Sequence, residues 1–243
     1  MAISRLKSSS IASGLQKYQT LWDAVSYVPV TSGSVLFLDA GDSSSYSGSG
    51  STWNDISGNA NNGTMTNVTY SSSNGGHMVF PGNGYVNCGN ASSLNISGAF
   101  TINVMLNTNT IATGTWLTLV AKGDSSYRFQ FQDSSAKWAF GTSGLSSIDT
   151  YSNLSCTINN WHMATVVYDG TTKKIYINGV LDVSGAVTGT LSTNAFNVYI
   201  GENAQATSRY FNGKISAVQI YNRALSQSEI VQNFSYFRTR YGI

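Results

Sequence analysis

Carboxylates are the side chains in this sequence with the clearest catalytic potential, so their spacing decides the first question. Hydrolysis of a glycosidic bond by the usual route needs two carboxylates, about 5–5.5 Å apart for retention or about 6.5–9.5 Å apart for inversion. Residues i and i+2 of a strand would supply such a pair, but no two acidic residues have this spacing, and the closest are Asp39 and Asp42. We therefore predict no catalytic residues. A glycoside hydrolase that pairs carboxylates across strands remains the alternative.

Other catalytic and metal-binding signatures are weak. The sequence has no GxSxG, HExxH or phosphate-loop motif, and His77 and His162 lie in strand-like runs where a hydrogen-bonded, half-buried histidine is expected. The loop at residues 55–59 (DISGN), with Asp39 or Asp42 nearby, would offer oxygen ligands to a structural calcium ion. The preferred interpretation is that its Asp and Asn side chains form Asx-turns. No metal or other cofactor is predicted.

Carbohydrate binding needs an exposed aromatic platform with polar groups around it. Tyr127, Trp138 and Tyr151 are the candidate residues for a host glycan, and Trp116 is of the same type. The competing interpretation is that alternation along a strand places each of these rings in the core. Trp161 opens a strand and is expected to be buried.

The elements that must position these residues are short strands. From Ser34 onward, alternating apolar runs are separated by turns rich in Gly, Ser and Asn. The stretch 161–185 contains two such runs, and its Asn178-Gly179 dipeptide favours a type I′ hairpin, because both residues tolerate a positive φ. A dozen or so strands without intervening helical patterns predict an all-β fold, an antiparallel sandwich of two sheets.

One helix is expected near the C-terminus. The sequence Ser226-Gln227-Ser228-Glu229 is a capping box, in which the Ser hydroxyl accepts from the N3 amide and the Glu side chain accepts from the N-cap amide. Ile230, Phe234 and Phe237 then share one face, and Gly242 follows as a stop signal. We predict a short helix over about 226–238.

Composition limits the partners. Charged residues make up 10% of the 243 residues and the net charge is +2. The chain therefore lacks the strong positive potential that attracts a phosphate backbone, and we expect no nucleic-acid binding. No stretch approaches the roughly 18 apolar residues of a membrane span, so no membrane insertion is predicted. The start, MAISRLKSSSIASG, lacks an apolar segment and is not expected to be a secretory signal. Cys88 and Cys156 are expected to be buried thiols, with a disulfide as the alternative.

Residues 1–32 differ from the rest and are interpreted as an N-terminal arm that anchors the domain at 33–243 to another chain. The arm combines apolar residues at roughly helical spacing with basic residues. The alternative is an extra element packed on its own domain. The predicted anchoring residues are Ile3, Arg5, Leu6, Lys7, Ile11, Leu15, Lys17, Leu21 and Trp22.

Several motifs resemble the laminin-G-like branch of the concanavalin A-like lectin/glucanase superfamily. They are SVLFLDAGD and TWNDISGNANNGTM near the start, NGYVNCGN, WHMATVVYDGTTKKIYINGV, and YIGENA followed by RYFNGKISAVQIYNRALSQSEI. The resemblance covers about residues 33–235 and implies a jelly roll. It says little about function, because this family contains lectins, adhesion modules, hydrolases and virion proteins. Its glucanases carry a Glu-x-Asp-x-Glu strand, which this sequence lacks.

The termini MAISRLKSSSIASGLQKY and FRTRYGI resemble the ends of structural proteins of tailed bacteriophages. This resemblance implies a non-enzymatic virion structural protein, with capsid decoration preferred over a tail or fibre role. We expect it to be assembled in the host cytoplasm, exposed on the particle in several copies, and bound to other virion proteins. A carbohydrate-binding adhesin, which reads host glycans from a tail or fibre, is the alternative from a different class.

Overall fold

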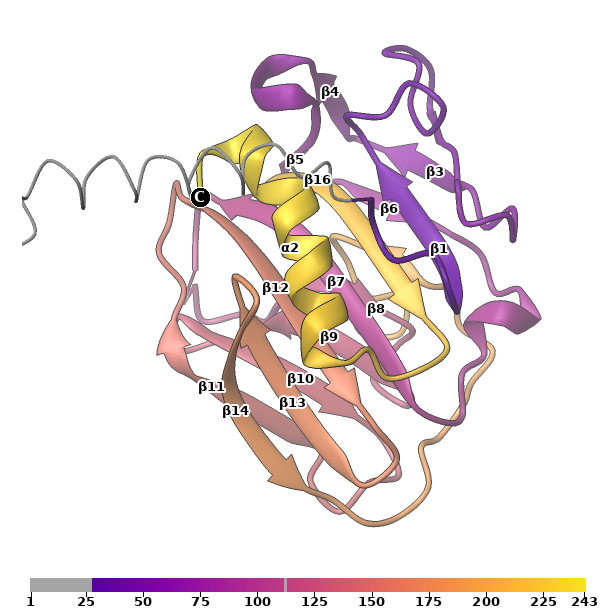
Figure 1. The fold of residues 1–243 in the computed structure, drawn as a ribbon, viewed down its shortest axis with the longest axis vertical. Coiled ribbons are helices and arrows are strands. Elements are labelled where there is room, and N and C mark those ends of the chain that lie inside the picture. Colours follow the sequence, from indigo (N-terminus) through magenta and orange to yellow (C-terminus); the bar gives the residue numbers. More distant parts are fainter. Residues whose placement is uncertain (1–27, 112) are drawn as a thin grey trace, which may run out of the picture.

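The structure, a computed structural model, describes residues 28–111 and 113–243 as a sandwich of two antiparallel sheets (Figure 1). Sheet A has eight strands: β1 (Ser34–Asp39), β4 (Thr69–Ser71), β5 (His77–Pro81), β7 (Phe100–Thr108), β12 (Trp161–Tyr168), β13 (Thr172–Ile177), β14 (Val180–Ala186) and β16 (Asn212–Tyr221). Sheet B also has eight: β2 (Thr52–Trp53), β3 (Gly63–Thr66), β6 (Tyr85–Asn87), β8 (Leu117–Ala121), β9 (Tyr127–Phe131), β10 (Lys137–Thr142), β11 (Asp149–Ser155) and β15 (Tyr199–Ile200). The predicted fold class is confirmed.

The strand order mixes distant parts of the chain. Sheet A runs β14-β13-β12-β7-β16-β5-β4, with β1 also paired to β16, and sheet B runs β11-β10-β9-β8-β15-β6-β3-β2. Short 3-10 turns, η1 (Ser73–Gly75) and η2 (Ser92–Leu94), occur in the connections. Because β15 lies between β8 and β6, residues near 85, 120 and 200 become neighbours in sheet B.

The core forms where the two sheets face one another. Alternation along each strand sends every second side chain inward, and these residues form one continuous hydrophobic cluster. In β9 and β10 the inward residues are Phe129, Phe131, Trp138 and Phe140, all fully buried. The cysteines are free thiols buried in the same cluster, as preferred from the sequence.

The β13–β14 hairpin has the predicted turn. Asn178 and Gly179 have φ angles of 51° and 79°, as a type I′ turn requires. Gly179 also lies against the C-terminal helix, where an added Cβ would come within 3.3 Å of the Phe234 ring. The hairpin is therefore fixed both by its own turn and by the helix beside it.

Helix α2 (Gln227–Tyr241) covers the outer surface of sheet A (Figure 1). The predicted capping box is present: the Ser226 hydroxyl accepts from the Glu229 amide at 3.3 Å, and Glu229 accepts from the Ser226 amide at 2.8 Å. The helix ends at Tyr241, three residues beyond the expected end at about 238, and the predicted stop Gly242 follows with a φ of 68°. A second hydrophobic cluster joins helix and sheet, and includes the contact between Trp161 and Tyr241, with ring centroids 4.1 Å apart.

The chain joins the domain beside this helix. The Val30 amide donates to Asn233 at 2.8 Å, and the Val28 carbonyl accepts from Gln232 at 2.8 Å. Val30 is 7% exposed and belongs to the cluster under the helix, although the sequence analysis placed it in the arm. The predicted anchoring residues 3–22 lie outside the described residues. No helix in the described part of the chain is long and apolar enough to cross a bilayer.

Candidate functional site

The side of sheet B that is turned away from the core is the candidate site, and we call it the outer face. The register aligns Thr118, Gln130, Ala139 and Tyr151 across β8, β9, β10 and β11, all pointing away from the core. Helix α2 covers the other sheet. It is the α-helix in the described residues, 28–111 and 113–243, so no α-helix covers the outer face there. Of these four residues Tyr151 is exposed, whereas Thr118, Gln130 and Ala139 are buried.

A first aromatic pair lies over the β8–β11 half of this face. The rings of Trp116 and Tyr151 stack with centroids 6.5 Å apart and planes inclined by 26°. Tyr151 is 39% exposed, and Trp116 is half-buried at the start of β8. Burial raises the pKa of Tyr151 first, and the neighbouring carboxylates Asp149 and Asp133 raise it further. The phenol is thus a neutral hydrogen-bonding group on an aromatic surface.

A second aromatic pair lies at the centre of sheet B. Tyr85 of β6 and Tyr199 of β15 stack with centroids 4.7 Å apart and planes inclined by 14°. Both point outward, because their neighbours Val86 and Ile200 are in the core. The two pairs are separated by about three strand spacings, or about 14 Å, which is a longer span than one monosaccharide.

The floor between the aromatic rings is polar and buried. Thr118 and Gln130 are at most 1% exposed, yet Thr118 Oγ1 and Gln130 Oε1 have no hydrogen-bond partner among the residues that the structure describes. A buried polar atom without a partner costs about 1–3 kcal/mol, so water or a ligand is needed to satisfy it. Both atoms are shielded from the surface, so an enclosed water is the partner that suits them.

Arginine–carboxylate pairs border the floor. Arg128 extends over Gly141, where an added Cβ would come within 2.6 Å of its side chain, and donates to Asp149 at 3.0 Å. Arg209 donates to Asp124 at 2.7 Å, and Arg128 Nε lies 3.6 Å from the same carboxylate. Arg128 therefore lies between two carboxylates and holds both in place.

Glu202 completes this border on the β15 side. It is 2% exposed, and its Oε1 accepts from the backbone amides of Asn203 and Arg209 at 2.8 and 3.1 Å. Glu202 raises the pKa of Tyr199 and of Tyr210, in each case after the larger effect of burial. A glutamate held by two amides in this way positions the loop that carries Arg209.

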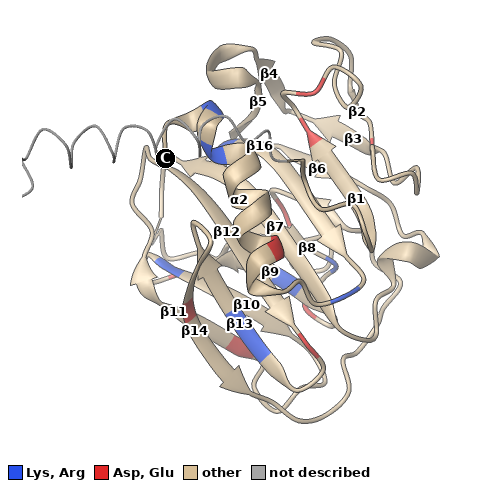
Figure 2. Ribbon diagram, viewed as in Figure 1, with Lys and Arg blue, Asp and Glu red and all other residues tan. Residues whose placement is uncertain are grey.

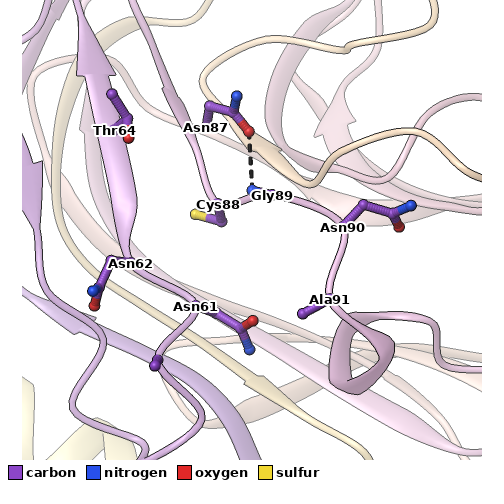
Figure 3. A pocket seen from close by; sticks show the side chains of 9 residues that line it. Asn61, Asn62, Thr64, Asn87, Cys88, Gly89, Asn90 and Ala91 are labelled. Carbon is purple, nitrogen blue, oxygen red and sulfur yellow. Dashed lines mark hydrogen bonds between the residues drawn. The ribbon is translucent and has the colours of Figure 1, made fainter.

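An asparagine-rich pocket lies at the β3–β6 end of the same sheet (Figure 3). It encloses about 370 Å³ and is lined by Ala60, Asn61, Asn62, Thr64, Asn87, Cys88, Gly89, Asn90 and Ala91. Asn87 accepts from the Gly89 amide at 2.9 Å, the bond drawn in Figure 3, and this leaves its amide group free to donate. Behind Asn90 lies Lys122, whose ammonium donates to Asn90 and to the Phe196 carbonyl and whose pKa burial lowers to about 8.

The predicted sugar-binding residues divide between core and surface. Tyr127 and Trp138 are fully buried, so neither ring can stack on a sugar, and these two predictions are wrong. Tyr127 and Trp138 alternate in step with Phe129 and Phe140, whose rings fill the space between the sheets. Tyr151 and Trp116 do lie together on the outer face.

The sequence analysis missed Tyr85 and Tyr199 as candidate residues. The available signal was alternation, since each adjoins one core residue, Val86 or Ile200, and must therefore point outward. Arg128 and Gln130 could have been found in the same way from their neighbours in β9. Their grouping with Tyr199 depends on strand order, which alternation does not supply.

The loop considered for calcium has Asx-turn geometry. Asp55 Oδ1 accepts from the Phe37 and Ser57 amides at 2.8 and 2.9 Å, and Oδ2 accepts from the Asn61 amide at 2.9 Å. Asp39 is instead paired with Arg240 at 2.6 Å. Within the described ranges, no group of three or more His, Cys, Asp or Glu is arranged to hold a metal ion.

The two histidines are both hydrogen-bonded, as expected. His77 Nδ1 lies 3.1 Å from the Ser73 carbonyl, and His162 Nε2 lies 3.0 Å from the Thr157 hydroxyl. Burial lowers the pKa of each ring. Local structure thus holds one nitrogen of each ring, while His162 Nδ1 is buried without a partner among the described residues.

Comparison with known proteins identifies the family. The family model for the concanavalin A-like lectin/glucanases superfamily, of the laminin G type, matches residues 80–231, more than half of the chain. The chain therefore belongs to this superfamily, as the resemblance in its motifs implied. A search of curated protein sequences finds no match.

Solved structures agree with the fold. The binding domain of Paraclostridial Mosquitocidal Protein 1 has a TM-score of 0.65 at 17% identity, over 84% of this chain and 52% of that one. Domain 4 of AbnA, a GH43 extracellular arabinanase from Geobacillus stearothermophilus solved in complex with arabinotriose, has a TM-score of 0.64 at 19% identity, over 82% of this chain and 97% of that one. Trypanosoma rangeli sialidase in complex with sialic acid has a TM-score of 0.63 at 15% identity, over 93% of this chain and 38% of that one. The chain thus spans about half or less of two of these proteins, and at such identities the likeness establishes the fold alone.

Proposed function

We propose that this domain is a non-enzymatic carbohydrate-binding module that uses the outer face of sheet B. The observation that carries the proposal is the presence of two stacked aromatic pairs, Trp116–Tyr151 and Tyr85–Tyr199, on a face with no helix over it among the described residues. Aromatic rings stack on the apolar faces of sugar rings, while amide and hydroxyl groups bond to sugar hydroxyls. The Tyr151 phenol and the Asn87 amide group, which is free to donate, supply such groups beside the pairs.

The arabinotriose complex of the arabinanase domain supports this proposal by analogy. That domain has a similar length and fold and was solved with an oligosaccharide. The arrangement of carboxylates gives less support to hydrolysis. Arg128 lies between Asp124 and Asp149, so these two carboxylates bond to a guanidinium.

A glycan array probed with the full chain tests the proposal, followed by titration calorimetry on the best ligand. Tyr151→Ala and Tyr199→Ala are each expected to weaken binding about tenfold, or about 1.4 kcal/mol. Phe234→Ala, which removes a ring from α2 on the opposite sheet, is the matched control and should bind normally. If the outer-face variants bind as tightly as the control, or if no glycan binds, the proposal is wrong.

We also propose that the module is displayed on a virion, with capsid decoration preferred, and is anchored by residues 1–27. Support comes from where the chain joins the domain: Val28 and Val30 contact α2, on the side of the sandwich opposite the outer face. An anchor attached there would leave the aromatic pairs turned away from the particle. The basic and apolar composition of residues 1–27 suits attachment to another protein.

Deletion of residues 1–27 tests this second proposal. The truncated protein is expected to keep its thermal unfolding transition and any glycan binding, but to be missing from purified particles. The full chain is the control, and particle occupancy is measured by quantitative mass spectrometry. Full occupancy of particles by the truncated protein would refute anchoring without affecting the carbohydrate proposal.

A further inference from the structure

The charges on the outer face bear on which glycans can bind there, an inference that rests on the proposed carbohydrate function. Charged residues of the domain are few, and both signs are scattered along the ribbon (Figure 2). A glycan that carries sialate, uronate or sulfate needs a cation that is free to pair with it, usually an arginine. Whether each cation on this face is already paired with a carboxylate therefore bears on whether acidic or neutral sugars bind there.

Both arginines on the face are already paired. Arg128 donates to Asp149 at 3.0 Å and lies 3.6 Å from Asp124, and its side chain is only 8% exposed. Arg209 donates to Asp124 at 2.7 Å, and the same carboxylate accepts from Asn203 at 2.8 Å. An incoming anion would therefore meet arginines whose positive charge a carboxylate already balances.

The two lysines near the face each donate to uncharged groups. Lys137 donates to the Asn153 carbonyl in β11. Lys122, behind the asparagine pocket, is fully buried and donates to Asn90 and to the Phe196 carbonyl. Burial lowers the pKa of Lys122 to about 8, so the side chain is still mostly protonated at pH 7.

Carboxylates and cations near the face are equal in number. Arg128, Arg209, Lys122 and Lys137 stand against four acidic residues. The four are Asp124, Asp133, Asp149 and Glu202. Burial raises the pKa of Tyr151, and Asp149 and Asp133 raise it further, whereas at Tyr199 burial and the neighbouring Tyr85 have larger effects than Glu202.

We propose that the outer face selects uncharged oligosaccharides and discriminates against sialylated, uronate-containing or sulfated glycans. An acidic sugar would meet arginines whose charge Asp124 and Asp149 already balance, and it would approach the negative charges of those carboxylates. A neutral sugar meets none of this repulsion. It stacks on the aromatic pairs and bonds to the amide and hydroxyl groups beside them.

The test compares neutral oligosaccharides with their sialylated and sulfated counterparts on one array, followed by calorimetry on the best matched pair at low salt. Addition of the acidic group is expected to weaken binding by about tenfold or more. Equal or tighter binding of the acidic counterpart would overturn the selectivity while leaving carbohydrate binding intact. Failure of every glycan to bind would overturn the proposed function, and the selectivity with it.

Charge variants identify the cause of the discrimination. Asp124→Asn releases Arg209 and lowers the negative charge, so the ratio of neutral to acidic affinity should fall severalfold. Asp133→Asn, at a half-exposed residue, makes the same charge change if the first variant folds poorly, as judged by circular dichroism. Asp169→Asn, which changes an ion pair with Lys174 on sheet A, is the control and should keep the original ratio. If the ratio in both outer-face variants equals that of the control, electrostatic selection is wrong.

Discussion

Asp182 of β14 accepts a hydrogen bond from the backbone amide of Asn153 in β11 at 2.6 Å, and so joins the edge strand of sheet A to the edge strand of sheet B. The other oxygen of the same carboxylate accepts from the Leu154 amide at 3.0 Å. These two amides belong to the strand that ends sheet B and would otherwise be free to pair with another chain. One aspartate therefore both closes this side of the sandwich and covers an edge.

Asp182→Ala is expected to lower the free energy of unfolding by about 1–2 kcal/mol, because two bonds from backbone amides to a carboxylate are lost. It should also promote self-association through the exposed β11 edge, where Leu154 is 59% exposed. Urea denaturation and light scattering measure the two effects. Asp182→Asn keeps one acceptor oxygen and should fall between the wild type and the alanine variant. An alanine variant with wild-type stability would show that the contact does not hold the edges together.

Thr118→Val is expected to leave stability unchanged or raise it by about 1 kcal/mol, and to leave glycan binding unchanged because the side chain does not reach the surface. The hydroxyl is fully buried and lacks a partner within the described part of the chain, so a methyl group of the same shape removes a desolvation cost. Thermal unfolding and calorimetry on the same sample measure stability and binding. Thr101→Val is the contrasting variant, since that hydroxyl donates to Arg223 and accepts from Leu225, and stability should fall. A loss of stability in Thr118→Val as large as in Thr101→Val would contradict the interpretation.

Glu229 should make stability depend on pH in the acid range. Its bonds to Arg223 lower the pKa from 4.5 to about 2, with help from the Ser226 amide and hydroxyl. A carboxyl whose pKa is lower in the folded state stabilises the fold above the unfolded pKa, and this stability is lost as the pH falls from about 4.5 towards 2. Glu229→Gln keeps an acceptor for the cap but cannot titrate. Its unfolding free energy should therefore vary less over this interval, and an unchanged pH profile would show that Glu229 is not responsible.

Removal of calcium is expected to leave the melting temperature unchanged. Both oxygens of Asp55 already accept backbone amides, and Asp39 is paired with Arg240. Differential scanning calorimetry with excess chelator, and again with millimolar calcium chloride, provides the measurement. A rise in the melting temperature on adding calcium would instead support the metal-binding interpretation of residues 55–59.

Local pattern was enough to predict the fold but not the site. Alternation, the Asn178-Gly179 turn and the Ser226–Glu229 cap each depend on residues close in sequence, and all three are confirmed. The pairing of Trp116 with Tyr151 depends on β8, β9, β10 and β11 lying in order, and Tyr85 meets Tyr199 only because β15 inserts between β8 and β6. Strand order brings together residues that are distant in sequence, and the alternation within one strand does not determine it. The prediction for Trp138 was wrong for a related reason. Its aromatic ring suggested a sugar-binding surface, but its place in the alternation along β10 puts the ring between the two sheets.

The two buried thiols determine how this protein responds to oxidation. Burial raises the pKa of Cys156 to about 12 and that of Cys88 further, so almost no reactive thiolate forms near neutral pH. The fold should consequently be indifferent to whether its surroundings are reducing or oxidising. A single cysteine introduced on the surface would then be the preferred target for a maleimide dye, and the domain can be labelled without removing its native sulfhydryls.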